Sequence, residues 1–338
     1  MPEALSRREL LLMASGAAML GSGLGRSVLA AAGPTPIRIA NSTGTLGVTM
    51  TALMRQEKFL ESFNLAPEVM SVADGTRILA AVVSGSVDIS LASGFGQVFP
   101  AIERGAGLKI VGGGALAPNT ALFTGKPYIN SLKDLEGRTV GTGSIGALVY
   151  QLVVTVLRKY NVDISKVRFV NIGSSTDGFR AVSMGTVDAG LAPAALIGYA
   201  ERYHLRPIPH GNLSVELPEY TFQGAWTSDR AIATNRNALV RALAAYGKLY
   251  RFVQTPGARG RFIQARRSVF TTAPEIEHEA DWNYIQTYKP FAVDLVLSPE
   301  RLRYIQGLNV SFKVQKGVMP FDRVADISLA ADAVKLLR

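Results

Sequence analysis

The sequence predicts an α/β protein with two similar units, each built on a mostly parallel sheet, that face each other across a cleft. Three observations predict it: a segment recurs one hundred residues later, β-rich segments alternate with helical ones, and 48% of the 338 residues are hydrophobic while 18% are charged. This composition supplies enough apolar surface for a core and excludes a disordered chain. The length is typical of about two domains.

Residues 1–32 have the pattern of an export signal. The pair Arg7-Arg8 precedes an uncharged run over residues 10–25, and small residues follow it. This order is typical of a secretory signal peptide, and the run is shorter than the ~20 residues that span a bilayer. The segment is similar to a twin-arginine signal with Leu10 in place of phenylalanine, and a Sec signal with two chance arginines is the alternative. We therefore expect an exported, soluble, periplasmic protein.

The internal match joins residues 81–92 (AVVSGSVDISLA) to residues 181–192 (AVSMGTVDAGLA), which are identical at seven of twelve positions. Gly85 and Gly185 occupy the position after a helix where a left-handed backbone conformation is common. The Val-Asp-x-x-Leu-Ala that follows predicts a short strand in each unit. The spacing is too long for a solenoid, so the match indicates two related units.

Each unit is predicted to contain, in order, a strand, a small-residue loop, a helix, a strand, an Asp-Gly turn, a helix, a glycine and a short strand. Strands that alternate with helices indicate βαβ units and a mostly parallel sheet. The predicted strands are 37–40, 67–72 and 87–92 in the first unit and 138–140, 167–172 and 187–192 in the second.

The rest of the chain is predicted to be rich in helices. Residues 235–254 carry apolar side chains at helical spacing. Further predicted helices are 274–288, 299–306 and 328–337, and the predicted loops are 257–260 and 268–273.

Two loops rich in glycine and hydroxyl residues are the main candidate binding segments. Residues 41–47 (NSTGTLG) follow the first strand of one unit, residues 141–146 (GTGSIG) follow that of the other, and each opens a helix. A helix N-terminus presents unpaired N–H groups and partial positive charge, which suits an anionic or strongly polar ligand group. Ligands of open α/β sheets bind at the carboxyl ends of strands, where both loops lie. Simple N-capping by Ser or Thr is the alternative.

Ser93, Gly94 and Thr176 are further candidates for the cleft. Ser93 and Gly94 follow the first repeated strand, and Thr176 lies in a Ser-Ser-Thr-Asp segment before a helix, where capping of that helix is the alternative interpretation. The repeated Asp88 and Asp188 are expected in turns or at strand edges, because a paired-carboxylate mechanism would need both in one pocket.

Three aromatic residues lie near the predicted connections between the units, namely Phe123, Phe222 and Trp226. Aromatic side chains at such a place either stack on a bound solute or pack in the core. Trp226 is therefore included among the candidate ligand contacts.

The composition excludes several function classes. The chain has no cysteine and three histidines, which removes disulfides, thiolate metal sites and thiol nucleophiles. The net charge is +10, but the basic residues are scattered along the chain. Their densest cluster, Arg259, Arg261, Arg266 and Arg267, is predicted to form one solvated helix face. We expect no metal, no cofactor and no nucleic-acid partner.

These features resemble the substrate-binding proteins of ABC importers in the nitrate, taurine and alkanesulfonate group, which includes a thiamine-precursor-binding branch. The resemblance covers about residues 36–338. Its most specific element is residues 131–141 (SLKDLEGRTVG), which is similar to the family's S-x-x-D-L-K-G-K-x-V-G. The resemblance implies a type II periplasmic-binding-protein fold with two crossovers, near residues 119–125 and 221–228.

The implied lobes are residues 36–121 with 226–338, and residues 122–225. Carried over by position, the family's ligand contacts fall on Ser42, Thr43, Ser93 and Gly94 in the first lobe and on Ser144, Ile145 and Gly146 in the second. The chain departs from anion-binding members because these loops hold no Arg or Lys, and Arg77 and Arg180 are the nearest candidates.

The implied function is capture of a small solute without chemistry. Hinge closure of two lobes would hold a small organic anion, a sulfonate or carboxylate, and the closed receptor would deliver it to an ABC permease in the inner membrane. A monomer is expected. The alternatives are an enzyme on the same fold, of a pyrimidine-forming or menaquinone-pathway type, and a sensor that docks on a membrane kinase.

Overall fold

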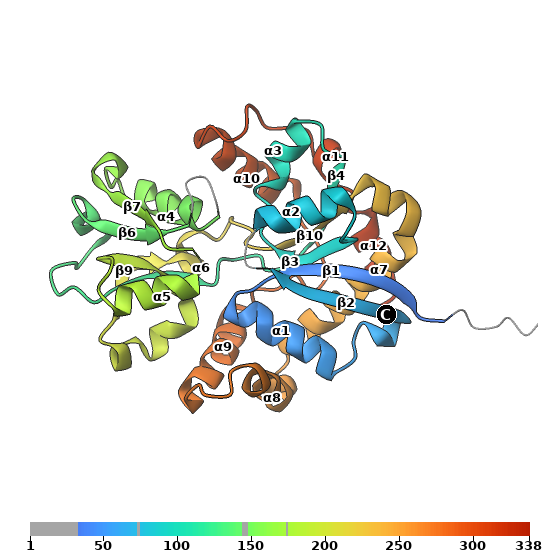
Figure 1. Ribbon diagram of the computed structural model, residues 1–338, viewed down its shortest axis with the longest axis horizontal. Helices are drawn as coiled ribbons and strands as arrows, with labels where there is room; N and C mark the ends of the chain where they lie inside the picture. Colours follow the sequence, from blue (N-terminus) through green and yellow to red (C-terminus); the bar gives the residue numbers. More distant parts are fainter. Residues whose placement is uncertain (1–32, 73–74, 144–147, 174) are drawn as a thin grey trace, which may run out of the picture. The chain divides into compact units, whose positions relative to one another are not determined.

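A computed structural model describes residues 33–72, 75–143, 148–173 and 175–338, and residues 34–338 form one compact unit. The predicted export signal lies outside the described residues. Two five-stranded sheets and the helices around them make up the described chain (Figure 1). The predicted α/β class with two similar units is confirmed.

The first sheet has the order β2-β1-β3-β10-β4. Strand β1 runs parallel to β2 and β3, whereas β10 runs antiparallel to β3 and β4. Its strands are β1 (Thr35–Ser42), β2 (Leu65–Val72), β3 (Ile89–Ser93), β4 (Leu108–Gly113) and β10 (Gly224–Ser228).

The second sheet repeats this arrangement in the order β7-β6-β8-β5-β9. Strand β6 is parallel to β7 and β8, and β5 is antiparallel to β8 and β9. Its strands are β5 (Thr120–Thr124), β6 (Thr139–Thr142), β7 (Arg168–Asn171), β8 (Ala189–Pro193) and β9 (Arg206–Asn212). The chain therefore passes to the second sheet between Gly113 and Thr120 and returns between Asn212 and Gly224.

The helices cover both faces of the sheets. The connections β1-α1-β2 and β2-α2-β3 run across the first sheet in opposite directions, and connections of this kind are right-handed. Helices α1 and α2 therefore lie on opposite faces of the first sheet, and α4 and α5 lie on opposite faces of the second (Figure 1). The helices are α1 (Thr45–Gln56), α2 (Gly75–Ser84), α3 (Val98–Glu103), α4 (Leu148–Lys159), α5 (Ser175–Ser183), α6 (Leu213–Glu216), α7 (Asp229–Val253), α8 (Arg259–Val269), α9 (Glu275–Tyr288), α10 (Pro299–Ser311), α11 (Phe321–Val324) and α12 (Ser328–Lys335).

The repeated aspartates perform the same structural task in both sheets. The Asp88 carboxylate accepts the backbone N–H of Arg38 at 2.8 Å, and the Asp188 carboxylate accepts that of Thr139 at 2.8 Å. Gly85 and Gly185, which end the preceding helices, have φ of 79° and 70°. The predicted left-handed glycines and strand-edge aspartates are confirmed, and each aspartate ties the start of one strand to its parallel neighbour, at the middle of β1 in the first sheet and at the start of β6 in the second.

Asp188→Asn is expected to lower the free energy of unfolding by about 1–3 kcal/mol at pH 7, because hydrogen bonds to a charged acceptor are weakened. Burial raises the pKa of Asp188, but the bonds from the Thr139 hydroxyl and N–H and from Tyr128 outweigh it, so the pKa lies below its ordinary value. A depressed carboxyl pKa adds stability above the unfolded-state pKa, and this stability is lost as pH falls through the folded-state pKa. Urea unfolding should therefore show a smaller loss near pH 3 than at pH 7, and equal losses would contradict the assignment.

The segment that carries the family resemblance has a structural explanation. Ser131 and Asp134 form a capping box, in which the Asp134 carboxylate accepts the N–H groups of Asn130 and Ser131, each at 2.8 Å. Gly137 has a φ of 77° and donates its N–H to the carbonyl oxygen of Lys166 at 2.8 Å. These bonds fix the turn that leads into β6.

Two sequence predictions about the helical region are wrong in part. The predicted loop at 257–260 is a short 3-10 helix, Pro256–Ala258, followed directly by α8 from Arg259, and Pro256 suits the first position of such a turn.

The predicted solvated face of arginines is wrong at Arg266, which is 4% exposed. Its Nη1 lies 2.5 Å from Asp281 Oδ2, and this counter-charge makes burial possible.

Candidate functional site

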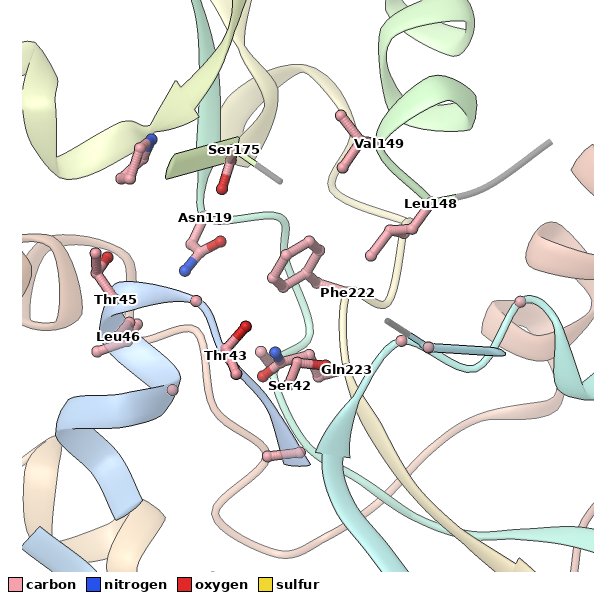
Figure 2. A pocket seen from close by; sticks show the side chains of 18 of the residues that line it. Ser42, Thr43, Thr45, Leu46, Asn119, Leu148, Val149, Ser175, Phe222 and Gln223 are labelled. Carbon is pink, nitrogen blue, oxygen red and sulfur yellow. The ribbon is translucent and has the colours of Figure 1, made fainter. Parts of the chain in front are cut away.

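A cavity of about 670 Å³ is lined by loops at the carboxyl ends of strands from both sheets and by the segments that connect the sheets. Its size is typical of a site for a small organic ligand. The loop after β1, the residues after β3 and the ends of β6, β7 and β8 all contribute (Figure 2). The polar lining residues include Ser42, Thr43, Gln97, Asn119, Gln151, Ser175 and Gln223.

The N-terminus of α1 opens into this cavity without a side-chain cap. Gly44 is the N-cap residue, with φ −61° and ψ 153°, and among the residues that the structure describes no side chain caps the first turn. The Ser42 and Thr43 hydroxyls have no hydrogen-bond partner within the described part of the chain and line the cavity (Figure 2). A Cβ on Gly47 would lie 2.9 Å from the Ser42 carbonyl oxygen, so this tight turn requires glycine. Because the N-cap residue of α1 is Gly44, the hydroxyls of Ser42 and Thr43 do not cap this helix, and the alternative interpretation of simple N-capping does not apply here.

The two connecting segments bond to each other at the cavity. The carbonyl oxygen of Ala115 accepts the N–H groups of Phe222 at 2.9 Å and Gln223 at 3.0 Å, and Gly114 donates its N–H to the Gln223 carbonyl at 3.1 Å. Ala115, Asn119, Phe222 and Gln223 line the cavity. The hydrogen bonds between the two connecting segments therefore fix the backbone that positions these side chains.

Aromatic residues of the C-terminal region form another part of the lining, which we call the aromatic wall: Tyr246, Tyr250, Tyr284 and Phe291. Their hydroxyls are engaged by the protein. Asn41 Nδ2 donates to the Tyr246 hydroxyl at 2.5 Å, and the Tyr284 hydroxyl donates to the Pro118 carbonyl at 3.2 Å. Burial raises the pKa of Tyr246 and Tyr284 to about 12, so both stay neutral at physiological pH.

The described lining carries almost no formal charge. Asp177 is the one Asp, Glu, Lys, Arg or His side chain among the described lining residues. Arg77 and Arg180, the cations expected nearest the loops, are exposed and do not line the cavity. Any anionic ligand group would therefore depend on hydroxyls, amides and the α1 N-terminus among the described residues.

The sequence-predicted site residues divide into three groups. Ser42, Thr43 and Gly94 line the cavity. Ser93, Trp226 and Thr176 do not line the cavity. Ser93 and Trp226 are 0% exposed, and Trp226 Nε1 donates to Ser93 Oγ at 2.9 Å. Ser144, Ile145 and Gly146 lie outside the described residues. Phe123 is also fully buried, whereas Phe222 lines the cavity.

Sequence reasoning missed the whole aromatic wall and Asn119. Tyr246 and Tyr250 belong to the apolar stripe of α7 and have the spacing of ordinary core residues. Asn119 directly precedes β5, and its place in the connection was the one signal that could have identified it. Only the tertiary arrangement shows that these side chains reach the same cavity as the β1–α1 loop.

Within the described residues, no group of three or more metal-ligating side chains is placed to hold a metal ion. No helix of the described chain combines the length and apolar character that a bilayer crossing requires.

Comparison with solved structures establishes the fold. The alkanesulfonate-binding protein SsuA from Xanthomonas axonopodis pv. citri, bound to MOPS, is 19% identical with a TM-score of 0.69, over 90% of this chain and 99% of that chain. A Candida albicans protein described as having the generic periplasmic binding protein fold is 14% identical, with a TM-score of 0.63 over 89% and 95%. The desulfurization enzyme DSZB is 11% identical, with a TM-score of 0.63 over 90% and 100%.

These similarities confirm the predicted type II periplasmic-binding-protein fold, which a binding protein and an enzyme share. No curated protein matches the chain in sequence. The family model described as NMT1/THI5 like matches residues 55–255, which is more than half of the chain. The chain therefore belongs to the NMT1/THI5-like family.

Proposed function

We propose that this protein is the solute-binding component of an ABC importer and captures a small organic anion, a sulfonate or carboxylate. The observation that carries the proposal is that one cavity is lined by corresponding strand ends of two similar sheets. The α1 N-terminus and the hydroxyls of Ser42 and Thr43, which no side chain of the described residues caps or bonds, supply donors for an oxyanion. The SsuA relative, whose fold the chain shares, is named as an alkanesulfonate-binding protein.

Capture works by closure of two lobes, residues 36–121 with 226–338 against residues 122–225. One contact between the lobes is a candidate latch. Gln151 of α4 donates from Nε2 to Asn309 Oδ1 of α10 at 3.0 Å, and Asn309 donates from Nδ2 to the Gly96 carbonyl at 2.8 Å. A ligand favours the closed state only by its higher affinity for that state.

The predicted export signal at residues 1–32 supports a function outside the cytoplasm, and the proposed partner is an ABC permease in the inner membrane. The receptor acts as a monomer and without a cofactor. Growth and uptake assays after gene deletion distinguish the roles: loss of solute uptake supports the importer, whereas loss of a transcriptional response alone identifies a sensor. Conversion of the ligand by the purified protein would instead identify an enzyme.

Ser42→Phe is expected to abolish ligand binding without unfolding the protein, because the side chain lies in the cavity and not in the core (Figure 2). Thermal shift measurements with alkane- and arenesulfonates and carboxylates test this, since a ligand of the native state raises the melting temperature. Ser84→Phe, at an exposed position of α2, is the matched control. Unchanged affinity in the Ser42 variant would contradict the proposed site.

A further inference from the structure

The aromatic wall borders the cavity with the edges of rings that are only 2–7% exposed, and it presents no free polar group. Tyr250 and Phe291 stack in parallel, with centroids 4.9 Å apart and an angle of 2° between the rings, and Tyr246 meets Tyr250 edge to face at 6.0 Å. The Tyr250 hydroxyl donates to the Leu91 carbonyl at 3.4 Å, and the other two hydroxyls are bonded to the protein as described. A ligand that meets this wall therefore meets apolar rings held in fixed positions.

Phe222 adds a second aromatic surface on the connecting segment. Its ring projects into the cavity near Asn119 and Leu148 (Figure 2). The side chain is only partly buried and makes no ring contact with another aromatic residue of the described chain. Its backbone is fixed by the bond to Ala115. Such a ring gains packing and dispersion energy when a flat ligand covers it.

Apart from Asp177, the polar part of the described lining is neutral. Ser42, Thr43, Asn119, Ser175 and Gln223 have no side-chain hydrogen-bond partner within the described residues. Hydroxyls and amides can solvate a neutral polar group or one delocalised negative charge. A helix N-terminus adds about half a positive charge, which is too little to balance a phosphate dianion.

We infer that the solute has an aromatic ring and a polar end that carries one carboxylate or sulfonate charge. The ring packs against Phe222 and the aromatic wall, and the polar end lies at Ser42, Thr43 and the first turn of α1. This inference rests on the proposed function and narrows its ligand class. It disfavours short aliphatic anions, which leave the partly exposed ring of Phe222 uncovered, and phosphate esters, which bring a second charge.

Isothermal titration of the purified mature protein with matched probes tests the inference. To test the role of the ring, the affinity of benzenesulfonate is compared with that of ethanesulfonate, and the affinity of benzoate with that of propionate. To test the effect of a second negative charge, the affinity of benzenesulfonate is compared with that of phenyl phosphate at pH 8. We expect each aromatic probe to bind at least about tenfold more tightly than its aliphatic counterpart, and phenyl phosphate to bind more weakly than benzenesulfonate. Aliphatic probes that bind as tightly or more tightly would overturn the inference and leave the proposed function standing. Binding of none of these anions would overturn both.

Phe222→Leu separates stacking from simple burial, because leucine keeps an apolar side chain but has no ring face. We expect it to weaken benzenesulfonate about tenfold and ethanesulfonate less than twofold. Phe63→Leu, which changes a partly buried phenylalanine outside the cavity, is expected to change neither. Equal effects of Phe222→Leu on both probes, in a variant that keeps its melting temperature, would overturn the stacking role.

Discussion

Arg266→Met is expected to lower the free energy of unfolding by about 3–5 kcal/mol at pH 7, because it leaves the buried Asp281 carboxyl without its counter-charge. Both side chains of this pair are 5% exposed. Arg266 Nε also donates to the carbonyl oxygen of Glu277 at 2.9 Å, and Nη1 donates to Thr49 at 3.4 Å. The arginine thus joins α8 to α9 and α1, and methionine keeps much of its length without the bonds. Guanidinium unfolding measures the loss.

The pH dependence of this variant identifies the cause of the loss. Burial raises the pKa of Asp281, and the attraction of Arg266 only partly offsets it. Without Arg266 the carboxyl takes up a proton in the folded state, so stability should fall as pH rises above the unfolded-state pKa of about 4. The deficit should therefore be smaller near pH 4 than at pH 8. Arg266→Met with Asp281→Leu should recover much of the lost stability, and failure of both results would show that the pair is not the cause.

Gly178→Ala is expected to lower the free energy of unfolding by about 3 kcal/mol, which is near the upper end for overpacked cores. Gly178 lies in α5 against β8, and a Cβ there would come 2.0 Å from the carbonyl oxygen of Leu191. The obstacle is backbone, so the helix or the strand has to move. Thermal and urea unfolding of the variant report the loss.

Gly307→Ala is the matched control for this prediction. Gly307 lies in α10, is exposed, and has nothing within 4 Å of its added Cβ. Alanine has the higher helix propensity, so this substitution should stabilise the protein by up to about 1 kcal/mol. Effects of the same sign at the two positions would contradict the assigned close approach of α5 to β8.

The internal match predicted the fold because the residues that match form structural hydrogen bonds and helix ends that both sheets require. Asp88 and Asp188 each receive a backbone N–H from the neighbouring parallel strand, and Gly85 and Gly185 each end a helix with positive φ. These requirements are local and restrict residue type, so they are visible in sequence. The alternation of strands and helices then limits the topology to parallel βαβ units.

The cavity lining was only partly visible because it depends on contacts between distant segments. Ser42, Thr43 and Gly94 follow strands and could be identified from local pattern. Tyr246 of α7 has the spacing of a core residue, and only the tertiary fold shows that its ring lines the cavity. Arg266 was misjudged for the same reason: its partner Asp281 is on another helix, and an arginine cluster in sequence does not show which member is paired.

The position of β10 has a consequence for synthesis on the ribosome. This strand lies between β3 and β4 in the first sheet, although its residues follow the whole of the second sheet in the chain. Residues 120–212, by contrast, supply every strand of the second sheet without interruption. During synthesis all strands of the second sheet can therefore pair before the first sheet is complete. The first sheet lacks β10 between β3 and β4 until Gly224–Ser228 has emerged from the ribosome.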